Sequence, residues 1–318
     1  MRRGQRKSDS NERWDTSRAR RTKSGLPLTL NRAPAPDLDP WVARIVIAKV
    51  EAPQDFSLSC GICNDIAFAR VLLAGEWLAE TADGPLALSG QAVLLGPHSK
   101  QMPVHCQGPF SSVNIGFRPG ALRQLFGLSL RPLVDRIELS DRLGLLDSGG
   151  KTPFSLEASA LEWAREAESR VRQMIKELDP LPPDPLSAAF ELASFRDPNI
   201  APGEFAEQQG VSLRQLERVV RRDFGLTPKT VLRRARALDL ASQMLGLAEP
   251  REEAEFHLRY FDQSHLIREF QAFFGITPQA FRASKRMLLT LNLETRAARR
   301  LEALDRLAPG EARPWEPR

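Results

Sequence analysis

The sequence has little of what membrane, secreted or disulfide-linked proteins need. It has only three cysteines in 318 residues, which is no even disulfide framework and suits a reducing cytoplasm. All its apolar runs are far shorter than the roughly 20 residues that a membrane-spanning helix requires. The charged N-terminus is not followed by the apolar segment of a secretory signal. These absences predict a cytoplasmic protein without a membrane partner.

The motifs of common enzyme classes are also missing. The chain has no glycine-rich phosphate loop, no Gly-x-Ser-x-Gly elbow and no His-Glu-x-x-His pair. One spacing suits metal or thiol chemistry: Cys60 and Cys63 form a Cys-x-x-Cys pair, and His98, His105 and Cys106 are candidate further ligands for zinc. Whole predicted strands separate these residues, so buried thiols are the simpler interpretation. We expect no catalytic residue, no metal and no cofactor.

The positive charge is concentrated at one end of the chain. The formal net charge is +5, yet residues 1–24 alone hold nine basic and three acidic side chains, so the remainder is close to neutral. A segment with almost no apolar residues cannot bury enough surface to fold alone. We therefore predict that residues 1–40 are a basic, disordered tail, and that the high isoelectric point says little about the folded part.

The hydrophobic pattern divides the rest of the chain into two parts. Between residues 41 and 118 the pattern is that of short strands, clearest where Val113, Ile115 and Phe117 alternate with polar residues, and it favours a small sandwich or barrel. Helical spacing begins at residue 156, stops before a run of prolines at 180–185, and resumes beyond it. The predicted fold class is α+β. Its domains are a β-rich domain at 41–150, a connecting helix and Pro-rich linker at 151–182, an all-α domain at 183–290 and a C-terminal tail at 291–318.

A pattern that recurs at an offset of 50 residues is the most informative feature of the helical part. Leu216, Val220 and Phe224 recur as Leu266, Phe270 and Phe274, and in both copies Gly-x-Thr-Pro follows. Each copy predicts a helix that ends at a glycine and is followed by a second helix. Two helices joined by a tight turn can place the second one in the major groove of DNA.

The outward faces of these two helices suit DNA because Arg, Gln and Ser side chains can read base edges. The helix between them, from Pro228 to about Leu245, is expected to be about 27 Å long, close to one turn of B-DNA. Arg233, Arg234 and Arg236 on that helix are expected to help bind phosphates. The outward side chains expected to contact DNA are Arg214, Gln215, Arg218, Arg221 and Arg222 in the first copy, and Gln263, Ser264, His265 and Arg268 in the second.

The two copies resemble the double helix-turn-helix of the AraC/XylS family of bacterial transcription regulators. The resemblance rests on Ser212-x-Arg214-x-Leu216-x-Arg218 with Phe224–Pro228, and on Tyr260–Leu266 with Phe274–Pro278 and Phe281-Arg282. It implies a helical module whose two recognition helices enter successive major grooves. Carried over by position, it places base or groove contacts at Arg214, Glu217, Arg218, Gln263, Ser264, Ile267 and Arg268. A weaker resemblance, at Arg118–Leu122 and the Pro-rich join, implies a cupin-like sensor in the N-terminal part.

Some positions depart from these family patterns. Glu255 replaces a small packing residue and Arg259 replaces a common turn glycine, so the second unit is expected to dock less tightly or to read less sequence. The N-terminal part lacks the close histidine pair of cupin metal sites.

The predicted function is a promoter-binding regulator modulated by a ligand of the N-terminal domain. Two alternatives stay open: a thiol- or metal-responsive sensor using Cys60 and Cys63, and an interaction protein whose second helix-turn-helix no longer reads sequence. The expected partner is double-stranded promoter DNA. RNA polymerase, a small-molecule effector and a second copy of the chain are further candidate partners.

Overall fold

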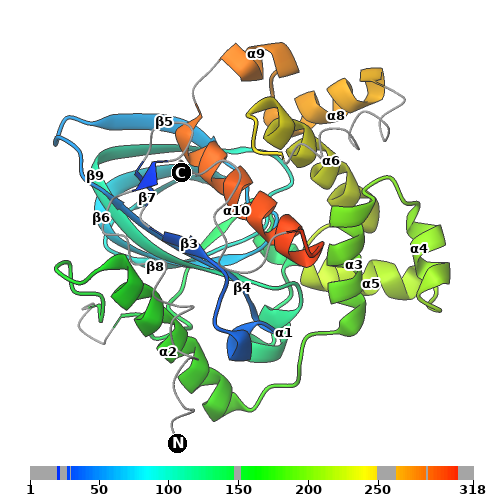
Figure 1. The fold of residues 1–318 in the computed structure, drawn as a ribbon, viewed down its shortest axis with the longest axis horizontal. Coiled ribbons are helices and arrows are strands. Elements are labelled where there is room, and N and C mark those ends of the chain that lie inside the picture. The colour runs from blue at the N-terminus through cyan, green and yellow to red at the C-terminus, as the bar shows by residue number, and fades with distance from the viewer. Residues whose placement is uncertain are drawn as a thin grey trace, which may run out of the picture.

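The computed structural model describes residues 20–21, 27–28, 30–146, 152–248, 263–283 and 286–306. An antiparallel sheet domain comes first and a helical region follows it (Figure 1). The strands are β1 (Arg20–Arg21), β2 (Pro27–Leu28), β3 (Leu30–Arg32), β4 (Val42–Val50), β5 (Ser57–Ile62), β6 (Phe68–Thr81), β7 (Gly84–Leu88), β8 (Ala92–Leu95), β9 (Met102–Phe117) and β10 (Ile137–Leu139).

Two long strands give the sheet its curvature. The main order is β10-β8-β6-β9-β4-β3, with β7 added to the second half of β6 and β5 to the first half of β9. β6 pairs with β9 along most of its length, and its other neighbour changes from β8 to β7 where the register shifts, between Leu72 and Glu76. Gly75 lies at this bend with φ 93°, and a Cβ there would come within 2.6 Å of the Phe110 Cβ atom. A side chain at this position would therefore be strained and would collide with β9.

The strand predicted at residues 112–117 is present. Alternating apolar and polar residues are typical of a strand with one buried face, but both faces of this strand are buried. Val113 and Ile115 lie in one core with 0% exposure, while Ser112 and Asn114 on the opposite face are only 5% exposed. The strands are also longer than the sequence suggested, because β6 and β9 have 14 and 16 residues. Alternating polarity did not reveal the second face because its polar groups bond to one another and to the backbone.

The helices are α1 to α6 and α8 to α10. Short 3-10 turns lie at Pro36–Leu38 and Arg131–Leu133. The helices are α1 (Ala121–Phe126), α2 (Ala160–Leu178), α3 (Pro185–Arg196), α4 (Pro202–Gln208), α5 (Leu213–Asp223), α6 (Pro228–Met244), α8 (Gln263–Phe274), α9 (Pro278–Ala283) and α10 (Met287–Ala303).

Helix α2, expected as a connecting segment, belongs to the core of the sheet domain. It begins with a capping box in which Ser159 and Glu162 bond each other's backbone N–H groups. Its buried side chains Trp163, Ala167 and Val171 pack in the same cluster as Val113 and Ile115 of β9. The helix therefore covers one face of the sheet and ends at Asp179, as the following proline predicts.

The predictions of a tail at each end of the chain, residues 1–40 and 291–318, are both wrong in part. Residues 30–40 are folded: Leu30–Arg32 is a strand, and Leu38 is 1% exposed. Residues 1–19 and 22–26, on which the disorder prediction mainly rests, lie outside the described residues. The second error concerns residues 287–303, which form α10 and not a tail. Leu289 and Leu293 of this helix are 0% and 1% exposed.

Within the described residues, the structure holds no helix that is both long and apolar enough to cross a membrane.

Candidate nucleic-acid interface

Helices α4 and α5 form the first helix-turn-helix, and local chemistry fixes the turn between them. Gly210 adopts φ 65°, which glycine accepts without strain. The Ser212 hydroxyl then accepts a hydrogen bond from the Gln215 N–H at 3.1 Å and caps α5. Leu216 and Val220, both 0% exposed, hold the inner face of α5 in an aromatic core with α3 and α4.

The outer face of α5 carries the predicted side chains in three different environments. Arg214, Gln215 and Arg218 are exposed, while Glu217 and Arg221 are partly buried. Arg222 differs from the expectation: its guanidinium pairs with Asp223 at 2.6 Å and with Asp184 at 3.1 Å. These two carboxylates neutralise the charge of Arg222 and hold its side chain, so it is not free to enter a DNA groove.

The second helix-turn-helix is described at its later helix, α8. Leu266, Phe270 and Phe274 are buried, as the repeat predicts, and Phe270 packs edge-on against Phe281 of α9. Ser264, Ile267 and Arg268 are exposed. The side chains of Gln263 and His265, and the whole of Glu255 and Arg259, lie outside the described residues.

Helix α6 connects the two units. Its arginines form ion pairs and hydrogen bonds inside the protein. Thr227 caps the helix by accepting from the Thr230 N–H. The carboxylate of Glu269 on α8 pairs with Arg236 at 2.6 Å and Arg233 at 3.2 Å, so both expected phosphate contacts are partly neutralised. Arg234 is 3% exposed and cannot reach a phosphate. The ion pairs of Glu269 hold α8 against α6.

Comparison with known families agrees with this architecture. Residues 205–284 match the model of a family described as "Helix-turn-helix domain" (HTH_18), over the segment that contains α5, α6 and α8. The chain carries an AraC-type helix-turn-helix domain. Residues 31–138, which contain most of the sheet, match a "Domain of unknown function" (DUF6597). A comparison with curated proteins found no match.

Solved structures give weaker likenesses. A lysine-to-alanine variant of apo ToxT from Vibrio cholerae has a TM-score of 0.44 and 10% identity, over 77% of this chain and 97% of that one. Wild-type ToxT from the same organism, bound to an unsaturated fatty acid, has a TM-score of 0.42 and 9% identity, over 75% and 94%. The AraC-like transcriptional activator CuxR has a TM-score of 0.28 and 14% identity, over 61% and 76%. TM-scores this low show only a partial likeness, and nothing about a ligand follows from them.

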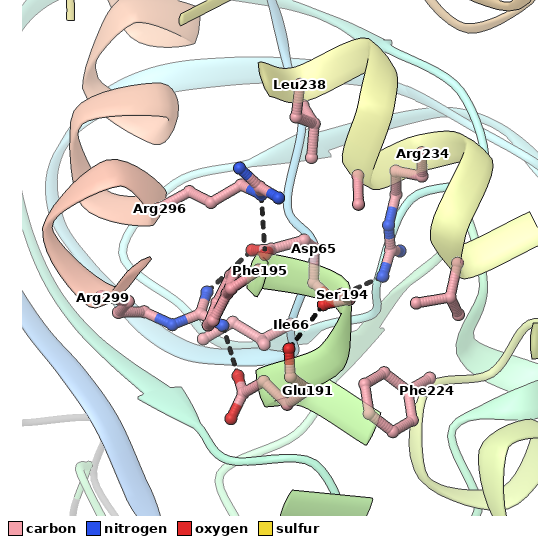
Figure 2. Close-up of a pocket in the computed structure, with 12 residues that line it drawn as sticks. Asp65, Ile66, Glu191, Ser194, Phe195, Phe224, Arg234, Leu238, Arg296 and Arg299 are labelled. Atoms are coloured by element: carbon pink, nitrogen blue, oxygen red, sulfur yellow. Dashed lines mark hydrogen bonds and ion pairs between the residues drawn. The ribbon is translucent and has the colours of Figure 1, made fainter. Parts of the chain in front are cut away.

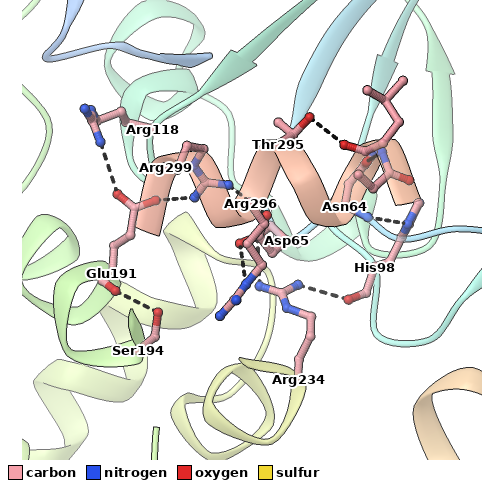
Figure 3. A network of polar contacts seen from close by, with 12 residues as sticks. Asn64, Asp65, His98, Arg118, Glu191, Ser194, Arg234, Thr295, Arg296 and Arg299 are labelled. Atoms are coloured by element: carbon pink, nitrogen blue, oxygen red, sulfur yellow. Dashed lines mark hydrogen bonds and ion pairs between the residues drawn. The ribbon is translucent and has the colours of Figure 1, made fainter. Parts of the chain in front are cut away.

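A buried polar network joins the AraC-type domain to the sheet domain (Figure 3). At its centre is Asp65, in the loop between β5 and β6. Its carboxylate pairs with Arg299 at 2.8 Å and with Arg296 at 3.4 Å, both from α10. Burial alone would raise the pKa of Asp65, but the charges of Arg299, Arg296 and Arg234 lower it. The carboxylate is therefore charged, and it binds the two domains together.

The network connects α10 to helices α3 and α6. Arg299 also pairs with Glu191 of α3 at 2.5 Å, and Arg296 pairs with Asp239 of α6. Arg234 of α6 donates to the carbonyl oxygens of His98 and Asp65, at 2.9 and 2.8 Å. Figure 2 shows five of these side chains around a small cavity between α3, α6 and α10: Asp65, Glu191, Arg234, Arg296 and Arg299. We call these residues, Asp65, His98, Glu191, Arg234, Asp239, Arg296 and Arg299, the interface network.

Helix α10 is the element of this interface that the sequence did not predict. It packs between the sheet and the AraC-type domain, and its Glu302 pairs with Arg44 of β4 at 2.7 Å. A signal was present, because Leu289, Leu293, Ala297 and Leu301 recur at every fourth residue. The many charges between them made the segment look like a solvated tail. Arg296 and Arg299 are instead buried in ion pairs, and Arg300 donates to the Phe195 carbonyl oxygen.

The cysteines offer little support for a thiol or metal sensor. All three are free thiols, and Cys63 packs in a core shared with α6, α8 and α10. Burial raises the pKa of Cys63 well above its ordinary value, and raises that of Cys106 to about 12. Thiols in this state react slowly because the thiolate is the nucleophile. Among the described side chains, no group of three or more His, Cys, Asp and Glu residues could hold a metal ion.

Proposed function

We propose that this chain is a transcription regulator that binds promoter DNA sequence-specifically through α5 and α8. One observation carries the proposal: two helices end in the same Gly-x-Thr-Pro pattern, each is held on its own core, and each keeps a polar face in solvent. An AraC-type domain with two such faces is suited to read two places on one duplex. We also propose that the DNA-binding part starts near residue 183 and extends through α10.

The two faces differ in the chemistry that they offer. The first has exposed Arg214 and Arg218, and an arginine fork can bond both acceptors of a guanine. The second has Arg268 beside Ile267, whose side chain is 42% exposed. An exposed apolar side chain on such a face can contact the methyl group of thymine. We therefore propose that the first unit provides most of the polar readout.

We further propose that a ligand of the sheet domain modulates DNA binding. The two domains share buried contacts through α10 and the interface network, so a change in one can alter how the other is held. This link is the physical requirement for regulation, because a ligand shifts an equilibrium only by its differential affinity for two states.

The test is fluorescence anisotropy with full-length protein, using the DNA upstream of its own coding region and a shuffled duplex of equal length. We expect tighter binding to the upstream segment, and weaker binding to both duplexes as salt rises. Arg218→Ala should cost about 1–3 kcal/mol on the upstream segment, since it removes one base contact. Arg123→Ala is the matched control, because Arg123 is exposed on α1, outside the two reading helices.

Three results would oppose the proposal. Equal affinity for the two duplexes would favour an interaction protein with general affinity for DNA. No binding at low salt would exclude DNA as the partner under these conditions. Equal losses from Arg218→Ala on both duplexes would mean that Arg218 contacts phosphate and not a base.

A further inference from the structure

The two reading helices, α5 and α8, are packed on separate cores. The first core contains Leu216 and Val220 of α5, and the second contains Phe270 and Phe274 of α8. Helix α6 contributes its N-terminal half to the first core and its C-terminal half to the second. The position of α5 relative to α8 therefore depends on the contacts that bridge the two units, and the sheet domain provides such a bridge.

Two loops of the sheet domain are bonded to each other and act as one body. The Asp135 N–H donates to the Pro97 carbonyl oxygen at 3.1 Å. The carboxylate of Asp135 accepts from the Ser99 N–H at 2.8 Å and from the Ser99 hydroxyl. These bonds join residues 96–101, between β8 and β9, to residues 130–136, before β10. We call the two loops together the platform.

The platform holds the C-terminal end of α5. The Leu130 N–H donates to the Arg222 carbonyl oxygen at 2.8 Å. Gly225 follows α5 at φ 75° and lies directly against the platform, since a Cβ there would come within 2.6 Å of the Val134 Cγ2 atom and 2.9 Å of the Leu130 carbonyl oxygen. A backbone oxygen cannot turn aside as the end of a side chain can. Any side chain at position 225 would therefore push α5 and the platform apart.

The same platform contacts α6 and the end of α8. The Gln101 N–H donates to the carbonyl oxygen of Phe273, in the last turn of α8, at 2.8 Å. Arg234 of α6 donates to the His98 carbonyl oxygen at 2.9 Å (Figure 3). One body of the sheet domain thus contacts the ends of both reading helices and the spacer between them.

The internal repeat contains a comparison for the contact at Gly225. Its equivalent 50 residues later is Gly275, which follows α8 at φ 72°. A Cβ on Gly275 would meet no described atom within 4 Å. Both glycines suit the left-handed conformation that ends a helix. Of the two, Gly225 is the one that must also lack a side chain to allow a close contact between domains.

We propose that the platform is a positioning element that sets the separation and orientation of α5 relative to α8. Helix α5 docks on it through Gly225 and the Arg222 carbonyl, and α8 through the backbone bond from Gln101. Two reading helices must meet two grooves at once, so their separation determines which spacing of half-sites the chain accepts. This consequence for DNA rests on the proposed function, whereas the positioning itself does not.

A distance measurement between two spin labels tests the positioning without DNA. The labels are attached through Gln215→Cys on α5 and Ser264→Cys on α8, both at exposed positions, in full-length protein that carries Cys60→Ala because the other two cysteines are buried. Gly225→Ala should widen the distance distribution at least about 1.5-fold, because the new Cβ breaks a close-packed contact. Gly275→Ala is the matched control: it adds the same backbone strain in open space and should keep the wild-type distribution.

The consequence for DNA is tested with the unlabelled proteins by fluorescence anisotropy. The duplexes are the upstream segment and the same segment with two base pairs inserted between the two protected turns, which rotates one half-site by about 70° relative to the other. The insertion should weaken wild-type binding at least about tenfold. In Gly225→Ala the same insertion should cost less than about threefold, because α5 can follow the rotated groove. Gly275→Ala should keep the wild-type penalty.

Several outcomes would contradict the proposal. An unchanged distance distribution in Gly225→Ala, or equal widening in both glycine variants, would overturn it. If Gly225→Ala does not fold, Asp135→Gly is the second variant: it removes both acceptors of Ser99, glycine accepts the φ of 57° at this position, and the distribution should again widen. A wider distribution with an unchanged insertion penalty would overturn the consequence for DNA.

The two proposals fail in different ways. A wider distribution in Gly225→Ala with no DNA binding by the wild type would refute the proposed function alone. Sequence-specific DNA binding with an unchanged distribution would refute the platform alone.

Discussion

At the scale of single residues, burial decides what each arginine does. Arg218 and Arg234 both come from the basic stretch that suggested nucleic acid, yet one is exposed and the other is 3% exposed. The sequence gives both the same charge, and the difference comes from what covers them. Arg234 lies under the sheet domain and satisfies two backbone carbonyls there. Its function is to hold the domains together.

Arg234→Met is therefore expected to destabilise the fold. It leaves the carbonyl oxygens of His98 and Asp65 without their donor and removes a cation near the Asp65 carboxylate. The loss should be about 2–4 kcal/mol in the free energy of unfolding, measured with urea. Lys229→Met, in the exposed first turn of the same helix, is the control and should change it by less than about 0.5 kcal/mol. Similar values for the two variants would contradict the role given to Arg234.

His98 should make stability depend on pH. Burial, with the nearby charges of Arg234 and Arg70, lowers its pKa from 6.5 to about 4. The unfolded chain therefore binds a proton at a pH where the folded chain does not, and stability falls as the pH drops from about 6.5 to about 4. Between pH 7.5 and 5 the loss from this residue should be about 2 kcal/mol.

Urea unfolding of the wild type and of His98→Asn at both pH values measures this effect. Asparagine keeps an acceptor for the Asn64 N–H that bonds the His98 ring, and it does not titrate. The variant should lose about 2 kcal/mol less than the wild type over this range. Parallel pH dependence in the two proteins would show that His98 is not the group responsible.

At the scale of elements, the contribution of each side chain to stability depends on which face of its helix is buried. Helix α5 illustrates this, since Leu213 and Leu216 are one turn apart but are 46% and 0% exposed. Leu216→Ala should cost about 2–4 kcal/mol by leaving a cavity under the helix. Leu213→Ala should change stability by less than about 0.5 kcal/mol. Thermal or urea unfolding of the pair checks the orientation of α5, and a larger loss at Leu213 would reverse it.

The helices α1 and α3 to α6 were predictable because each has local start and stop signals. Ser212 and Thr227 cap α5 and α6, and Gly225 adopts φ 75° after α5 as a helix-ending glycine should. Helix α10 has no such signal: Arg286 caps it without a side-chain bond. Its charges are buried only because partners from distant segments, Asp65 and Asp239, meet them. Long-range pairs of this kind leave no trace in a single sequence.

At the scale of the whole molecule, the same limit applies to the candidate sites. The repeat predicted which helices face solvent, because a helix face is set by local spacing. A cavity lined by Arg70 could not be predicted from the sequence, because its walls come from β4, β6, β9 and α10. The Cys-x-x-Cys pair has a spacing typical of metal and thiol sites, whereas Arg70 belongs to no motif in the sequence. In the folded chain Cys63 lies in a shared core, while Arg70 lines a cavity.

The arrangement of the two reading helices leads to a prediction about the footprint on DNA. Helix α6 has 17 residues, so it is about 26 Å long, and one turn of B-DNA is roughly 34 Å. The ion pairs of Glu269 fix α8 to this spacer. Each helix should therefore meet its own groove on one side of the duplex, and the footprint should be asymmetric and cover about two turns.

Arg218→Ala and Arg268→Ala form a matched pair for this test, because they occupy equivalent exposed positions 50 residues apart. Hydroxyl-radical footprinting should show that each variant loses protection over a different half of the site. Arg218→Ala should weaken binding more, since its face also carries exposed Arg214, whereas the face of Arg268 carries Ser264 and Ile267. A symmetric footprint would mean that two chains bind with one helix each. A larger loss from Arg268→Ala would make the second unit the dominant reader and reverse the order that the exposed charges indicate.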